Sequence, residues 1–119
     1  MIEKEKPVVS VVWNEDITLA VNSALDQLKL PDLTGKTVLL KPNVGRETSP
    51  KLGINTNPEV VDAVFNYLRN RFKANYVIGD SPIINTDTIK AFDQSGYSTL
   101  LEDENLQFLN LDDISPTEL

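Results

Sequence analysis

The fold of this chain is decided by Val38-Leu39-Leu40-Lys41-Pro42-Asn43-Val44-Gly45, an apolar run that ends abruptly in a lysine, a proline and an asparagine. A second run of the same kind is Tyr76-Val77-Ile78-Gly79-Asp80-Ser81-Pro82. Short apolar runs bounded by turn residues are typical of buried strands. Because open α/β sheets collect ligands outside the carboxyl ends of parallel strands, the polar residues after both runs mark the expected site.

Strands and helices are predicted to alternate outward from these two runs. Strands are expected at residues 8–13, 37–41, 75–80 and 106–111. Apolar residues at helical spacing predict a first helix after Asn14 and a second over residues 58–72. Asn57 and Pro58 form a strong start for the second helix, as cap and first helical residue. A third helix is expected after Asn85 or Thr86, ending before Gly96, with one further helical turn behind it.

Alternating strands and helices of this length indicate a parallel sheet with right-handed crossovers. The expected fold class is therefore α/β, a three-layer, mostly parallel sheet of about four strands with crossover helices, in a Rossmann-like topology. The 119 residues are predicted to form a single domain. Because the last strand lacks a covering helix, we expect residues 1–119 to be the N-terminal part of a larger domain.

The composition excludes several kinds of chemistry. The chain contains no cysteine and no histidine, which excludes thiolate nucleophiles, disulfides, iron–sulfur ligation and a Ser-His-Asp triad within it. No cofactor is evident, and a bound metal is limited to a hard ion with oxygen ligands, such as Mg²⁺. No general base or nucleophile stands out, so the sequence predicts no particular reaction.

The charge of the chain bears on its partners. A net charge of −7 argues against a general nucleic-acid surface. The sequence has no membrane-length apolar run and no signal-peptide pattern, so a cytoplasmic location is expected. The loop 41–57 is nevertheless basic, because it contains Lys41, Arg46 and Lys51 and a single acidic residue, Glu47. This pattern indicates an anionic ligand, and the alternative is an ordinary solvated loop.

The candidate ligand-binding residues lie in two loops. Lys41 is expected either to anchor a phosphate or carboxylate or to pair with Asp80, and the two roles are compatible. Asp80 is also the candidate ligand for Mg²⁺, with Glu47 or Asp87 completing an oxygen set; the alternative is a simple turn. The complete candidate set comprises Lys41, Asn43, Asn55, Thr56, Asn57, Asp80 and Ser81.

The asparagines and the threonine of this set have structural alternatives. Asn43, Asn55, Thr56 and Asn57 can donate to an anion beside the free backbone N–H groups of the helix that starts at Pro58. For Asn57 a helix cap is the competing interpretation, and for Asn43 a turn former. The loop contains neither a Walker phosphate loop nor a dinucleotide-binding glycine fingerprint.

With these residues laid out, the chain resembles the N-terminal half of an uncharacterised family called domain of unknown function 362. The resemblance implies an α/β domain, often found in prokaryotes and sometimes joined to cysteine-rich ferredoxin-like modules. Family members usually continue past the end of this chain into a later strand and a lysine-containing motif. Four stretches carry the resemblance in order: Leu39–Asn43, Asn55–Val61, Val77–Pro82 and Phe92–Tyr97.

Two hypotheses for function follow. The first is a domain that binds a small anionic or phosphate-bearing ligand at the carboxyl ends of its strands, as part of a larger protein. The alternative is a protein-interaction or dimerisation module, in which the last strand and the acidic residues 102–119 dock a ferredoxin-like redox partner or a second copy. The expected partners are thus a small anion, and either a homodimer mate or a missing C-terminal half.

Overall fold

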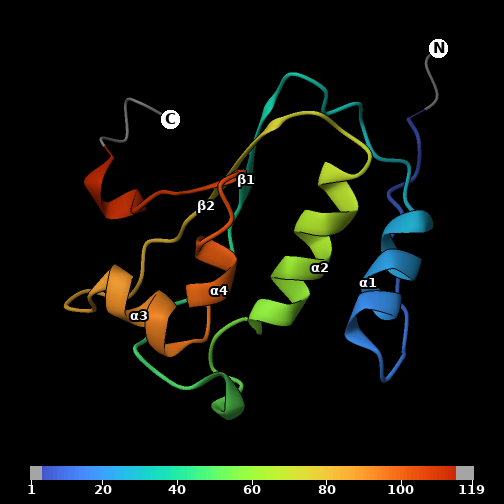
Figure 1. Cartoon of the computed structure of the whole chain (residues 1–119). Helices are drawn as coiled ribbons and strands as arrows, with labels where there is room; N and C mark the ends of the chain where they lie inside the picture. The colour runs from blue at the N-terminus through green and yellow to red at the C-terminus, as the bar shows by residue number, and fades with distance from the viewer. Residues whose placement is uncertain (1–3, 115–119) are drawn as a thin grey trace.

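The computed structural model describes residues 4–114, which contain a parallel three-stranded sheet in the order β1-β2-β3 (Figure 1). The predicted α/β architecture is therefore confirmed, with three described strands where about four were expected. The strands are β1 (Thr37–Leu40), β2 (Asn75–Ile78) and β3 (Leu106–Phe108). The helices are α1 (Ile17–Asp26), α2 (Pro58–Arg69), α3 (Thr88–Gln94) and α4 (Ser98–Leu101), and two short 3-10 helices are η1 (Pro50–Leu52) and η2 (Leu111–Asp113).

The predicted strand at residues 8–13 is wrong for the described structure. These residues form neither a helix nor a strand, and no backbone hydrogen bond joins them to any other residue of the 4–114 range. The segment lies beside α1, on the side of the molecule away from the sheet (Figure 1). A β-branched sequence favours an extended chain, but a strand also requires a neighbouring strand to pair with.

The parallel register decides which side chains share each face of the sheet. Val38 lies opposite Tyr76, which lies opposite Leu106, and these side chains share one face of the sheet. That face packs on apolar residues of α2, α3 and α4, which form the core. The opposite face carries Leu39, which is 43% exposed. Of the three expected layers, the described residues supply the sheet and the helices on one face, with α1 packed on α2.

Two helix starts differ from the sequence expectation by one or two residues. The side chain of Asp16, rather than Asn14, caps α1 by accepting from the Leu19 N–H at 2.9 Å. The side chain of Asp87, rather than Asn85 or Thr86, caps α3. Each predicted capping residue is a polar residue of the same turn as the observed one. Residue propensity therefore located each turn, but it did not identify the residue that caps the helix. No helix among residues 4–114 is both long and apolar enough to cross a membrane.

The joint between α3 and α4 supports the loops that carry the candidate site. Gly96 has φ +88°, as expected for the residue that follows a helix end. Next to it, the buried Tyr97 ring meets Phe92 edge-to-face with centroids 5.2 Å apart, and Phe92 meets Phe108 in the same way at 5.1 Å. This aromatic cluster packs the α3–α4 joint against β3 and so supports the carboxyl ends of the strands.

Candidate functional site

The carboxyl ends of β1 and β2 bring Lys41 and Asp80 together. Leu40 lies opposite Ile78 in the sheet, so the residues that follow both strands leave at the same edge. The Lys41 ammonium lies 2.6 Å from the Asp80 carboxylate. The Lys41 side chain is 55% exposed, whereas that of Asp80 is 4% exposed. The ion pair considered from the sequence is thus present, and it holds a half-exposed lysine on a buried carboxylate.

The Asp80 carboxylate is held from more than one side. Its second oxygen accepts a hydrogen bond from the Val44 backbone N–H at 2.9 Å, which ties β2 to the loop after β1. Burial raises the pKa of Asp80, but hydrogen bonds from Lys41 and from the Val44 and Ser81 backbones outweigh it. The pKa of Asp80 therefore lies below its ordinary value of 3.8, and the carboxylate is ionised at neutral pH.

This lowered pKa predicts acid lability that Asp80 itself causes. A depressed pKa in the folded state contributes stability above the unfolded-state pKa, and that stability is lost as the pH falls through the folded-state value. We expect urea unfolding of the wild-type protein to lose more free energy between pH 5 and pH 2.5 than that of Asp80→Asn. Equal pH dependence of the two proteins would contradict this prediction.

Asn43 and Thr56 lie together and close the base of the loop. The Thr56 N–H donates to the Asn43 carbonyl at 2.8 Å, and the Asn43 N–H donates to the Thr56 hydroxyl at 3.0 Å. Asn43 is exposed, as Lys41 is. The buried Tyr97 hydroxyl donates to the Thr56 carbonyl at 2.7 Å, so the loop is anchored on the α3–α4 joint. Sequence reasoning missed Tyr97, because its partner is a backbone carbonyl distant in the chain.

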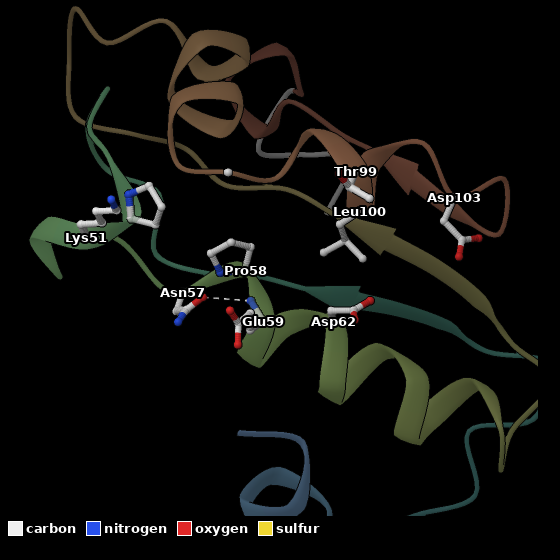
Figure 2. Close-up of a pocket in the computed structure, with 10 residues that line it drawn as sticks. Lys51, Asn57, Pro58, Glu59, Asp62, Thr99, Leu100 and Asp103 are labelled. Atoms are coloured by element: carbon white, nitrogen blue, oxygen red, sulfur yellow. Dashed lines mark hydrogen bonds between the residues drawn. The ribbon is translucent and has the colours of Figure 1, made fainter. Parts of the chain in front are cut away.

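Asn55 and Asn57 have structural partners of their own. Asn55 is buried and donates to the Arg46 carbonyl and to the Ser95 hydroxyl, both at 2.7 Å. These bonds tie the loop to the end of α3, and neither of them is to Lys41 or Asp80. The Asn57 side chain accepts from the Glu59 N–H at 3.0 Å and caps α2 (Figure 2), which is the structural alternative considered for it.

Ser81 is oriented by an acidic residue that the sequence did not single out. Its hydroxyl donates to the Asp112 carboxylate of η2, and the Thr88 hydroxyl donates to the other oxygen of Asp112 at 3.4 Å. Asp112 was predicted only as part of an acidic flank. Its contact with Ser81 depends on where β3 lies in the sheet, which local sequence does not encode.

The residues expected to hold Mg²⁺ are occupied by other partners. Asp80 binds the Lys41 ammonium, which takes the position of a cation, while Glu47 accepts from the Asp87 N–H at 3.2 Å. Asp87 caps α3. No group of three acidic, histidine or cysteine side chains that could hold a metal converges among residues 4–114. A magnesium ion at Asp80 stays a prediction, and the ion pair disfavours it.

A pocket of about 680 Å³ lies between the start of α2, η1 and α4 (Figure 2). Asn57 is the member of the candidate set that lines it. The pocket lining contains three carboxylates, Glu59, Asp62 and Asp103, and one base, Lys51. Asp103 is paired with Arg69 at 2.7 Å, so Glu59 and Asp62 are the acids that outnumber Lys51. Like charges disfavour an anion there. The anion hypothesis is therefore better placed at Lys41 than in this pocket.

These features define a class of protein: an α/β domain whose polar loops meet at the carboxyl ends of a parallel sheet. The chain belongs to the DUF362 family, described as a domain of unknown function, whose family model matches residues 38–118. The matched range contains the whole candidate set, whereas α1 and the segment before it lie outside it. No curated protein and no solved structure matches the chain significantly.

Proposed function

We propose that this DUF362 domain binds a small anionic or phosphate-bearing ligand at the carboxyl ends of β1 and β2, as part of a larger protein. The observation that supports the proposal is the half-exposed Lys41 ammonium, which the buried Asp80 carboxylate orients from behind. An ammonium group has three N–H donors. Asp80 engages it on one side, so its remaining donors are free to bind oxygen atoms of a ligand.

The charge of the surrounding loop supports an anion over a cation. Arg46 and Lys51 form no ion pair with any other residue of the described range. The Lys41–Asp80 pair is neutral as a whole, so Arg46 and Lys51 against Glu47 leave the loop with one net positive charge, and Lys51 also lines the pocket at the start of α2. Local charge of this kind raises the concentration of an anion near Lys41 even though the whole chain is acidic.

The geometry supports binding and specifies no reaction. Asp80 is ionised and paired with Lys41, and the Ser81 hydroxyl is bonded to a carboxylate. These contacts do not define the reacting atom of a substrate, so the proposal concerns binding alone.

A thermal-shift experiment tests the proposal with inorganic phosphate, nucleotides and Mg²⁺ as separate probes. A ligand at one hundred times its dissociation constant adds about 2.7 kcal/mol, or roughly 10 °C in melting temperature for a domain of this size. We expect a shift with a phosphate-bearing probe that disappears in Lys41→Ala. A shift with Mg²⁺ alone would instead indicate the cation site.

Lys73→Ala is the matched control for that experiment. Lys73 is an exposed lysine that precedes β2, at the opposite end of the sheet, so the variant loses the same charge away from the site. The phosphate shift should persist in Lys73→Ala. Equal losses in both variants, or no shift in a wild-type protein that melts cooperatively, would contradict anion binding at Lys41.

The interaction-module alternative has one observation in its favour. β3 lies at an edge of the described sheet, and acidic residues flank it on both sides, at Glu102–Glu104 and at Asp112 and Asp113. An unpaired strand edge can add a strand from another chain. We propose docking of a basic or redox partner at this edge as the second candidate. A lysine introduced at the exposed Gln107 would weaken such docking.

A further inference from the structure

The pocket between η1, α2 and α4 has a preformed apolar end. Gly96 meets two prolines there, since a Cβ atom at Gly96 would lie 3.4 Å from Cγ of Pro58 and 3.5 Å from Cγ of Pro50. Each proline is the first residue of its helix and has a fixed φ, so this end of the pocket is rigid. Leu100 adds an aliphatic side chain from α4. A preformed cavity of about 680 Å³ with apolar walls has the size of a small-molecule site.

The start of α2 borders the pocket, but its first N–H groups already have acceptors. Pro58 has no N–H group, and the Glu59 N–H donates to the Asn57 side chain at 3.0 Å. The Val60 N–H donates to the Asn57 carbonyl at 3.1 Å. Anions at a helix start bind to such N–H groups when they are unpaired. The start of α2 therefore does not favour an anion in the pocket.

Two carboxylates of the pocket form no ion pair within the described range. Glu59 and Asp62 are exposed and three residues apart on α2, so they lie on the same side of the helix. Asp103 differs from them, because it is paired with Arg69 at 2.7 Å. Figure 2 shows Lys51 at the end of the pocket opposite to Asp62. The part of the pocket beside Glu59 and Asp62 therefore attracts a cation.

We propose that this pocket binds a small organic amine, with its ammonium group beside Glu59 and Asp62 and its apolar body against Pro58 and Leu100. The carboxylates supply hydrogen-bond acceptors of opposite charge for the ammonium group. Because exposed ion pairs contribute little by themselves, burial of the apolar body has to supply much of the affinity. The pocket lining includes neither Lys41 nor Asp80, so this site is independent of the anion site.

Calorimetric titration of the intact chain with probes of one shape tests the proposal. Phenylbutylamine carries the cation on an apolar body, phenylbutyrate carries an anion on the same body, and phenylbutanol is neutral. Ethylamine carries the cation and lacks most of the apolar body. We expect saturable binding of phenylbutylamine, with dissociation constants about tenfold larger for both phenylbutyrate and ethylamine. Equal binding of phenylbutyrate and phenylbutylamine would overturn the proposal.

A double substitution of the two carboxylates tests their role. Glu59→Gln combined with Asp62→Asn should raise the dissociation constant of phenylbutylamine about tenfold and leave that of phenylbutanol unchanged. Both residues are exposed, so the melting temperature should stay close to that of the wild-type protein. Glu102→Gln combined with Glu104→Gln is the matched control, because it removes two charges from exposed positions outside the pocket lining. Binding of phenylbutylamine should persist in this control.

An NMR titration of the ¹⁵N-labelled protein with phenylbutylamine locates the bound probe. The amides of Gly96 and Leu100 should shift saturably, and that of Val44, beside the Lys41–Asp80 pair, should not. No saturable binding at millimolar phenylbutylamine would overturn the proposal, as would equal losses of binding in the two double variants. Binding of a lysine-containing peptide without binding of any small amine would also overturn it, and would assign the pocket to a lysine side chain of a protein partner.

Discussion

Gly79→Ala is expected to destabilise the domain by about 3 kcal/mol or more, because the added methyl group has no room. A Cβ atom at Gly79 would lie 2.1 Å from the Leu109 carbonyl oxygen and 3.1 Å from its carbonyl carbon. Both are backbone atoms, so no side chain can rotate away. The Gly79 N–H also donates to the Leu40 carbonyl at 3.2 Å, and the Leu109 N–H donates to the Ile78 carbonyl at 2.8 Å. These two hydrogen bonds hold the backbone around Gly79 between β1 and the chain after β3.

The measurement for Gly79→Ala is a urea or thermal unfolding curve beside that of Gly45→Ala. A Cβ at Gly45 would meet its nearest atom, in the Asn43 side chain, at 3.4 Å, and the backbone there has no positive φ. Gly45→Ala should therefore melt close to the wild-type protein, in the same part of the fold. Similar melting temperatures for Gly79→Ala and the wild-type protein would contradict the close approach between β2 and the chain after β3.

Asp80→Ala is expected to cost about 3 kcal/mol, since it removes a buried, hydrogen-bonded carboxylate. The Val44 N–H loses its acceptor and the Lys41 ammonium loses its ion-pair partner. Asp80→Asn keeps the size of the side chain and an oxygen that can accept from Val44, so it should cost less. For a domain of this size we expect the melting temperature of Asp80→Ala to fall by roughly 10 °C.

Lys41→Ala completes this comparison. Its side chain is 55% exposed, and Asp80 keeps the hydrogen bond from Val44 without it, so its loss should destabilise the domain less than the loss of Asp80. The order of melting temperatures should therefore be wild type, Lys41→Ala, then Asp80→Ala. If Lys41→Ala melts at a lower temperature than Asp80→Ala, the lysine rather than the carboxylate supports the loop, which would contradict this prediction.

Sequence patterns predicted the parts of the fold that depend on neighbouring residues. The second helix begins at Pro58 behind the Asn57 cap, and Gly96 has the left-handed conformation expected after a helix end. An ion pair between Lys41 and Asp80 was one of two alternatives for the lysine, because adjacent parallel strands end at one edge of the sheet, and the structure contains that pair. Local patterns and sheet topology were sufficient for these features.

The errors concern features that depend on a distant partner. Residues 8–13 have the composition of a buried strand, yet composition does not provide a strand to pair with. The bonds from Asn55 to Ser95 and from Ser81 to Asp112 join positions 40 and 31 residues apart. Nothing in the local sequence distinguishes these residues from ligand-binding ones, so their structural partners appear only when the chain is folded.

The most direct test of anion binding is an NMR titration of the ¹⁵N-labelled protein with inorganic phosphate. The proposal predicts saturable shifts of the amides of Lys41, Val44 and Ser81, because a ligand on the ammonium perturbs the Asp80 carboxylate that Val44 and Ser81 contact. These shifts should vanish in Lys41→Ala and persist in Lys73→Ala. Saturable shifts confined to the start of α2 and α4, around the pocket, or no shifts at millimolar phosphate, would contradict an anion site at Lys41.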